Sequence, residues 1–340
     1  MASRFTQILL PLPMVLLAAC GDPGAFDPQE DALSGAYQSA IDDGMLEDES
    51  TLDAPIEVSF CANICDSKHM IIDCDDRTQR LAPAANVDPY RYVGRFSNGC
   101  TGTLIGSNVV LSAAHCFLDS NNNFRSGPIS FSLAQTSIGP CGRPYGNQFV
   151  SHVTIPGEYT GSSNAIANKS WDYAVVRLNA SPAGAEPMPY GHTDWSYLQT
   201  EEAQSIGYPG TDKIAGTLWD TGRQSFLERW LNPTDGNLSG VLYVDNDAEG
   251  GQSGSPVFYD YWQFSGDGSL QVKHKLVGVL IGSPVSECQA GRVWAPRLVP
   301  GAVNRIDTWK ADPDSLTYSR RYKAYTGSET SPAEPPAGGC

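Results

Sequence analysis

Gly250-Gly251-Gln252-Ser253-Gly254-Ser255-Pro256 is the most informative stretch of this sequence. A serine that attacks a carbonyl group must stand on a sharp turn that exposes its Oγ, and glycine permits the backbone of such a turn. The turn must also aim N–H groups at the oxygen that becomes negative during acyl transfer. The stretch therefore predicts Ser253 as a nucleophile, with the N–H groups of Gly251 and Ser253 as its oxyanion hole. A plain glycine- and serine-rich turn between two strands is the alternative.

Two other segments supply the partners that such a serine needs. Val110 to Cys116 places His115 at the end of an apolar strand, and Trp171 to Val176 places Asp172 at the start of another. Each residue alone is typical of a structural histidine or a strand-edge aspartate. Together they predict a triad in which His115 accepts the proton of Ser253 while Asp172 orients the imidazole ring and stabilises the imidazolium.

The sequence around these residues is organised as short strands. They are rich in β-branched residues and are bounded by Gly, Asn, Asp or Pro: 92–96, 102–105, 109–111, 174–178, 240–244 and 276–281. One helix is predicted over Pro300–Trp309, with Val303 and Ile306 on one face, and Pro313 ends it. Many strands followed by one terminal helix predict an all-β barrel or sandwich domain.

Composition fits a folded, exported protein. The chain has 340 residues, 41% of them hydrophobic and 18% charged, with 34 glycines and 24 prolines that favour many turns. Its formal net charge of −16 argues against a nucleic-acid partner, because phosphate binding needs clustered Lys and Arg.

The N-terminus has the pattern of an export signal. Arg4 precedes an apolar run from Ile8 to Ala19, which is too short to span a bilayer but suits a signal-peptide core. The run ends in Leu17-Ala18-Ala19-Cys20-Gly21, which resembles a bacterial lipobox and implies lipidation of Cys20 after cleavage before it. An ordinary signal peptide is the alternative. The sequence thus predicts export, with a lipid anchor at Cys20 that attaches the protein to the membrane of the bacterial cell envelope.

Eight cysteines remain once Cys20 is set aside, and disulfides are the default for an even set outside the cytoplasm. They are Cys61, Cys65, Cys74, Cys100, Cys116, Cys141, Cys288 and Cys340, and composition leaves their pairing open. Zinc binding by the first three is disfavoured, because a paired C-x2-C pattern is absent. The stretch from Asp119 to Phe124 lacks the glycine and the closing Glu of a calcium loop. No metal and no cofactor is predicted.

These features divide the chain into four parts. Residues 1–19 are the predicted signal peptide, 20–75 an acidic linker or pro-segment, 76–312 the β domain, and 313–340 a proline-rich tail.

The three motifs together resemble those of chymotrypsin-fold (S1-type) serine peptidases, most of all the V8-like or glutamyl-endopeptidase branch. Gly207-Tyr208-Pro209-Gly210, Asp75-Asp76-Arg77-Thr78 and the helix of Val303 to Trp309 resemble further elements of that branch. The resemblance covers roughly residues 71 to 312. It implies two six-stranded antiparallel β-barrels with a C-terminal helix, an active site between the barrels, a Cys100–Cys116 disulfide, and protein or peptide substrates.

The residues that the resemblance assigns to the substrate pocket depart from the branch. Leu280, in Gly278-Val279-Leu280-Ile281-Gly282, replaces the histidine of glutamyl-specific members, and Ala248 replaces a threonine. Asp247 stands where trypsin-like enzymes bind Lys or Arg. The pocket of Asp247, Ala248, Leu280 and Gly282 therefore favours a basic side chain slightly over an apolar one, and disfavours Glu.

Activation and activity leave alternatives open. Gln252 replaces the aspartate that pairs with a new N-terminus in trypsin-like zymogens. A free N-terminus formed near residues 68 to 77 is a hypothesis for completing the site. The rival functions are a catalytically silent, surface-anchored binding protein on a protease scaffold and an esterase, whose usual nucleophile context differs from the one here.

Overall fold

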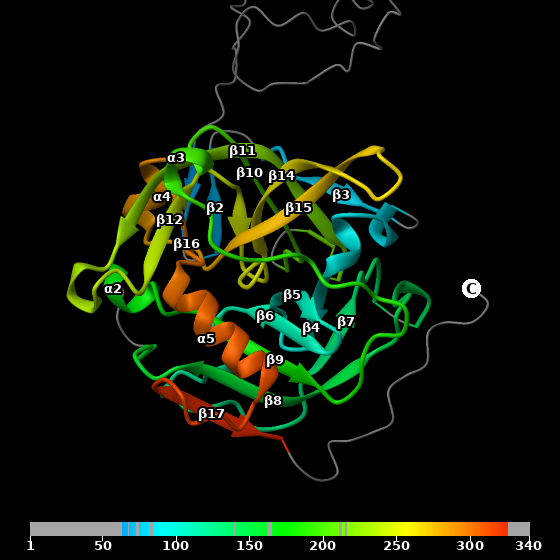
Figure 1. Ribbon diagram of the computed structural model, residues 1–340, viewed down its shortest axis with the longest axis horizontal. Coiled ribbons are helices and arrows are strands. Elements are labelled where there is room, and N and C mark those ends of the chain that lie inside the picture. Colours follow the sequence, from blue (N-terminus) through cyan, green and yellow to red (C-terminus); the bar gives the residue numbers. More distant parts are fainter. Residues whose placement is uncertain are drawn as a thin grey trace, which may run out of the picture. The chain divides into compact units, whose positions relative to one another are not determined.

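The computed structural model describes residues 63–66, 68–72, 75–81, 84–138, 140–161, 165–210, 213–214 and 216–325 (Figure 1). The predicted signal peptide, Cys20 and most of the predicted linker lie outside these residues. No helix in this described part is both long and apolar enough to cross a membrane.

Six strands form a closed antiparallel barrel, drawn in the lower part of Figure 1. The order is β8-β7-β4-β5-β6-β9, and the ring closes because β8 pairs with β9 as well as with β7. Their bounds are β4 Val93–Phe96, β5 Thr101–Gly106, β6 Val109–Ser112, β7 Ser130–Leu133, β8 Gln148–Pro156 and β9 Ala174–Leu178. The interior of this barrel is filled by branched side chains that are fully buried, such as Val93, Leu104, Val110 and Val176. A small closed barrel has room inside only for side chains.

A second antiparallel sheet lies above the barrel in Figure 1, in the order β15-β14-β10-β11-β12-β16, with β3 on β11. Its strands are β3 Thr78–Arg80, β10 Glu202–Gly207, β11 Leu218–Leu231, β12 Gly240–Val244, β14 Pro256–Phe264, β15 Leu270–Val279 and β16 Val293–Pro296. The end strands β15 and β16 share no ladder. They meet where the single bridge Gly278–Arg297 forms, just beyond Pro296.

The prediction of two six-stranded barrels is therefore confirmed for the first sheet and only in part for the second. Pro296 has no N–H to contribute to a ladder with β15. The bridge and the hydrogen bond from Leu298 N–H to Val277 O (2.8 Å) join the two ends instead. The second unit is a strongly curved sheet rather than a ring of continuous ladders.

Helix α5, Pro300–Ala311, confirms the predicted C-terminal helix. Proline stands at its start, where a missing N–H has no consequence. Ala302, Ile306 and Trp309 are buried and join the core that surrounds the barrel strands. The other helical turns are short: η2 Ala84–Asn86, η3 Tyr90–Tyr92, η4 Ala114–Phe117, η5 Pro140–Gly142, α2 Ile166–Lys169, α3 Trp195–Leu198, η6 Pro233–Asp235 and α4 Val285–Gln289.

The folded unit extends past both predicted boundaries of the 76–312 domain. Strand β17, Arg320–Ala324, lies in the predicted tail and pairs with β8 along Pro156 to His152. Strands β1 (Ile64–Cys65) and β2 (His69–Ile71) lie in the predicted linker, and β2 pairs with β13 (Ala248–Glu249). The disulfide Cys65–Cys288 holds this hairpin to α4.

Candidate active site

Two glycines shape the turn that carries Ser253. Gly251 has a φ of +103°, and a Cβ there would lie 2.4 Å from the carbonyl oxygen of Tyr208. Gly254 has a φ of +91°, and its Cβ would lie 2.1 Å from the carbonyl oxygen of Thr101. Any other residue would be strained and would clash at both positions. The glycines on either side of Ser253 are therefore required by the backbone.

The backbone N–H groups of this turn fall into two sets. Four of them donate to carbonyl oxygens: Gly250 to Lys68 (2.9 Å), Gln252 to Glu249 (3.0 Å), Gly254 to Leu280 (2.8 Å) and Ser255 to Gln252 (2.9 Å). Within the described residues, no acceptor takes the N–H of Gly251 or of Ser253. The two N–H groups predicted for the oxyanion hole are thus the two of this turn that have no hydrogen-bond acceptor in the described part of the chain.

His115 and Asp172 come from neighbouring barrel strands. His115 lies in η4 directly after β6, and Asp172 lies two residues before β9. Because β6 pairs with β9 from Val109 to Ser112, the two residues meet at one end of the strands. His115 Nδ1 lies 2.9 Å from Asp172 Oδ2, and the backbone N–H of His115 donates to Asp172 Oδ1 at 2.9 Å.

Asp172 is fully buried among groups that favour its charged form. Burial alone would raise the pKa of this carboxyl, but the charge and hydrogen bonds of His115, together with Lys169, hold the pKa below its ordinary value. The hydroxyl of Tyr159 donates to Asp172 Oδ2 at 3.1 Å. An ionised, fixed carboxylate at this point orients the imidazole with Nε2 free for a reacting group.

A disulfide and a backbone hydrogen bond bring Ser253 to the histidine. Cys100 and Cys116 are bonded, as the resemblance implies. The carbonyl oxygen of Ser253 lies 3.8 Å from Cys116 Sγ and accepts from the N–H of Thr101 at 2.9 Å. The nucleophile turn of the second sheet is therefore attached to β5 of the barrel, beside His115. The sulfur atoms of Cys100 and Cys116 also lie near the His115 ring, but the disulfide uses both of them.

Asp247 is placed differently from its predicted role. Its side chain is 1% exposed, and its oxygens accept from the N–H groups of Ile72 (2.8 Å) and Asp76 (3.3 Å). The pKa of Asp247 is raised to about 7. Burial is the main cause and the nearby charge of Asp76 adds to it, while the hydrogen bond from the Ile72 N–H acts in the opposite direction. Asp247 thus binds the chain segment after β2.

The other predicted pocket residues lie in or beside an apolar core cluster of the second sheet, against which Met70 packs. Ala248 and Leu280 are buried. Gly282 is covered by Met70, because a Cβ at Gly282 would lie 3.0 Å from Met70 Cε. Met70 Sδ also lies 3.1 Å from the backbone N of Ser283. Sequence analysis missed Met70, because its partner is more than two hundred residues away in the chain.

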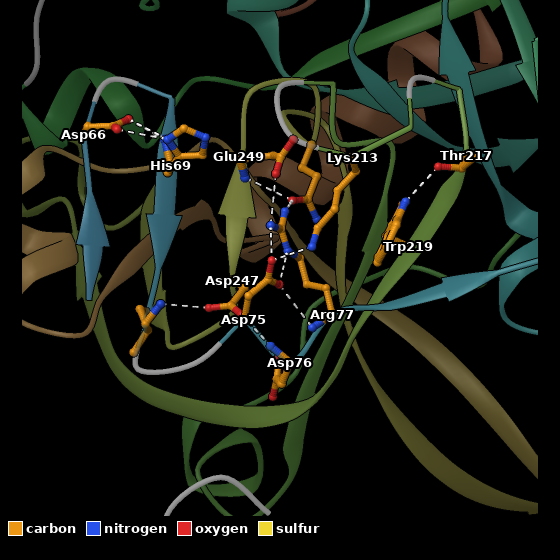
Figure 2. A network of polar contacts seen from close by, with 12 residues as sticks. Asp66, His69, Asp75, Asp76, Arg77, Lys213, Thr217, Trp219, Asp247 and Glu249 are labelled. Atoms are coloured by element: carbon orange, nitrogen blue, oxygen red, sulfur yellow. Dashed lines mark hydrogen bonds and ion pairs between the residues drawn. The ribbon is translucent and has the colours of Figure 1, made fainter. Parts of the chain in front are cut away.

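Figure 2 shows a buried ionic network beside the nucleophile turn, with Arg77 at its centre. Arg77 forms ion pairs with Asp75 (2.8 Å) and Glu249 (3.0 Å). It also donates to Gln252 Oε1 at 2.8 Å. A second cation, Lys213, pairs with Asp75 at 2.6 Å. Burial alone would lower the pKa of Arg77, but the hydrogen bonds and charges of Asp75 and Glu249 raise it above its ordinary value. The guanidinium is therefore a permanent buried cation next to the residue that precedes Ser253.

Comparison with known proteins supports this geometry. Residues 100–266 match the family described as "Trypsin-like peptidase domain". The chain is 31% identical over 194 residues to the "Glutamyl endopeptidase" of Bacillus licheniformis, covering 55% of this chain and 54% of that protein. It is 29% identical over 202 residues to the "Extracellular metalloprotease" of Bacillus subtilis, covering 56% of this chain and 58% of that protein. The chain thus spans little more than half the length of these curated relatives.

A solved structure shares the fold. "Structure of Glu endopeptidase in complex with MPD" superposes with a TM-score of 0.52 at 20% identity, covering 70% of this chain and 98% of that one. This likeness shows a chymotrypsin-like fold. Together with the match over residues 100–266, it shows a chymotrypsin-like fold in a chain whose central part is similar to trypsin-like peptidase domains.

Proposed function

We propose that this protein is an exported serine endopeptidase in which Ser253, His115 and Asp172 form the catalytic triad. One observation carries the proposal most directly. The half-buried His115 is held by the buried Asp172 at 2.9 Å, and Cys116, the residue after His115, contacts the turn that bears Ser253 and the two N–H groups of Gly251 and Ser253 without an acceptor among the described residues.

The reaction follows from these positions. Ser253 Oγ attacks the peptide carbonyl while His115 Nε2 takes its proton, and the imidazolium is stabilised by Asp172 across the 2.9 Å contact. The oxygen that becomes negative accepts from the N–H groups of Gly251 and Ser253. His115 then gives the proton to the leaving amine, and an acyl-enzyme remains on Ser253. A water molecule, deprotonated by His115, releases the acid and restores the serine.

The environment of Asp247 changes the proposed substrate preference. The Asp247 carboxyl is 1% exposed and accepts from the backbone N–H groups of Ile72 and Asp76, so the segment after β2 shields it from a substrate side chain. The remaining groups at the predicted pocket are apolar: Ala248, Leu280 and Met70 against Gly282. We therefore propose cleavage after apolar side chains, in place of the basic preference that the sequence favours.

Export is supported by the disulfides. Disulfides such as Cys65–Cys288 and Cys100–Cys116 are typical of oxidising compartments. One of the two relatives above is named "Extracellular metalloprotease". The lipid anchor at Cys20 remains a proposal that rests on the Leu17–Gly21 pattern. Mass spectrometry of the membrane fraction would reveal a diacylated N-terminal peptide beginning at Cys20.

The triad is tested by active-site labelling with a fluorophosphonate. The wild-type protein and Ser255→Ala, a matched change two residues along in the same turn, are expected to be labelled. Ser253→Ala is expected to lose labelling and to lose about a million-fold in turnover. Labelling of Ser253→Ala would refute the nucleophile, and an unlabelled, folded wild-type protein would favour the binding-protein alternative.

Substrate preference is tested separately on a peptide library with unlabelled wild-type enzyme, from a preparation in which labelling of a sample has shown a reactive serine. Cleavage after Leu, Met or Phe is expected. Dominant cleavage after Arg or Lys would show that Asp247 acts as a counter-ion despite its backbone partners, and dominant cleavage after Glu would refute both preferences.

A further inference from the structure

The segment before β3 enters the second sheet as a buried charged element. The Arg77 side chain is 1% exposed and the Glu249 side chain is fully buried, with 3.0 Å between Arg77 Nη2 and Glu249 Oε2. A buried ion pair contributes little unless further hydrogen bonds satisfy it. Here Asp75 supplies them through a two-point contact to Arg77 Nε and Nη2, at 2.8 and 2.9 Å.

The remaining donor of the guanidinium reaches the nucleophile turn. Arg77 Nη1 donates to Gln252 Oε1 at 2.8 Å, and the same oxygen accepts from the backbone N–H of Glu249 at 3.0 Å. The N–H of Gln252 donates back to the carbonyl oxygen of Glu249 at 3.0 Å. The turn from 249 to 252 is thus closed twice, and Arg77 holds the side-chain half of that closure.

The two N–H groups of the proposed oxyanion hole belong to the residues before and after Gln252. Neither N–H has an acceptor among the described residues, but the carbonyl oxygen of each peptide group is bonded. Gly250 O accepts from the N–H of Gly210 at 2.8 Å, and Gln252 O accepts from the N–H of Ser255 at 2.9 Å. The fully buried side chain of Gln252 adds a further hold on the same turn through its hydrogen bond with Arg77.

We propose that Arg77 is a positioning residue for the oxyanion hole, acting through Glu249 and Gln252. This inference rests on the proposed function. Arg77 is part of the uncut chain and places a buried positive charge beside the turn of Ser253. On this proposal, no new N-terminus formed by cleavage at residues 68 to 77 is needed to complete the site. The chain ahead of Arg77 is itself bound, by the β2–β13 pairing and by the Ile72–Asp247 hydrogen bond.

The expected effects separate positioning from general stability. Arg77→Met should lower kcat by about 100-fold, near the loss for one oxyanion-hole donor, with KM changed by less than about threefold. Arg77→Lys keeps the charge and most of the volume but not the planar fork, so it should fold and lose about tenfold in kcat. A peptide-aldehyde inhibitor, which forms a tetrahedral adduct, should lose affinity by the same factors as kcat.

Arg80→Met is the matched control. Arg80 lies three residues along, on β3, and pairs with Asp220 at 2.8 Å, and no contact links it to residues 249–252. Its loss should lower the melting temperature while kcat stays within about twofold of wild type. Equal kcat for Arg77→Lys and wild type, or equal loss for the Arg77 and Arg80 variants, would overturn the proposal.

Hydrogen exchange gives a readout that needs no activity. Peptides covering 249–255 should exchange faster in Arg77→Met and Arg77→Lys than in Arg80→Met. Unchanged exchange in this turn would also overturn the proposal. A wild-type protein that is not labelled by the fluorophosphonate but shows the expected exchange pattern would refute the proposed function and leave the role of Arg77 in shaping the turn.

Discussion

Asp247, which is buried, and Asp76, which is exposed, are neighbouring acids at the point where the N-terminal segment meets the second sheet. The pKa values of both are raised, in each case chiefly because burial disfavours the charged form. These two carboxyls therefore bind more protons in the folded protein than in the unfolded chain between a pH near 4 and neutrality. Their contribution to the free energy of unfolding is present at the lower pH and is lost as the pH rises through this range.

Asp247→Asn should remove most of this dependence. Each unit of pKa shift corresponds to about 1.4 kcal/mol, so the wild-type protein should lose a few kcal/mol, by order of magnitude, between pH 4 and pH 8. The variant should lose clearly less, as measured by urea unfolding at several pH values. Asp267→Asn is the matched control, because hydrogen bonds from Ser265 and Ser269 lower the pKa of Asp267 to about 2, away from the two acids. Its curve should run parallel to that of wild type, and a parallel curve for Asp247→Asn would contradict the prediction.

The site could be predicted from the sequence only where the chemistry is local. His115, Asp172 and the glycines around Ser253 each lie in a short segment whose own residues indicate the role, without reference to distant parts of the chain. The contacts of Arg77 with Gln252 and of Asp247 with Ile72 each join residues 175 positions apart. No local pattern carries such a pairing. For this reason the sequence places Asp247 in the substrate pocket, and it offers Arg77 only as part of the Asp75–Thr78 segment that resembles the V8-like branch.

At the scale of the elements, β17 extends the barrel beyond the helix that the sequence takes as the end of the domain. Its five residues pair with β8, and Tyr325, 7% exposed, follows it. Arg321 donates to Asn122 Oδ1 at 3.0 Å and to the carbonyl oxygen of Tyr159 at 3.4 Å. The strand thus supports the loop whose tyrosine contacts Asp172.

A chain ending at residue 312 should therefore be less stable than one ending at residue 325. At about 0.5–1.5 kcal/mol for each hydrogen bond, loss of the β17 ladder should lower the free energy of unfolding by about 3 kcal/mol. Denaturant unfolding of the two truncated proteins measures the difference. Equal midpoints would mean that β17 adds nothing to the barrel.

The elements that the sequence predicts best are those with uniform burial. β5, β6 and β12 are buried along their whole length, and all three are apolar enough to be found. β17 reads Arg-Arg-Tyr-Lys-Ala with partly exposed side chains, so it resembles a polar tail. The 14-residue β11 alternates buried and exposed positions irregularly because a bulge falls on it.

At the scale of the whole molecule, Cys65–Cys288 joins residues 223 positions apart. A recognition site for a specific protease, placed between 66 and 68 in the turn of the β1–β2 hairpin, should give a two-chain protein when cut. It should run as one species without reductant and as two with it, and the cut form should keep its peptidase activity because Arg77 stays in place. Separation of the two pieces without reductant would contradict the Cys65–Cys288 pairing. The control is the same cut in the double variant Cys65→Ser, Cys288→Ser, which lacks this disulfide.

The same bond bears on how the proposed lipid anchor at Cys20 could be lost. The chain ahead of residue 65 is joined to the folded domain through the main chain and also through Cys65–Cys288. A cut between 66 and 77 opens the main chain but leaves this disulfide in place, so shedding of the domain from the proposed anchor then also needs a thiol reductant. A cut upstream of Cys65 leaves the disulfide within the domain, where it holds nothing to the anchor. The position of the cut therefore decides whether Cys65–Cys288 must be reduced before the domain is shed.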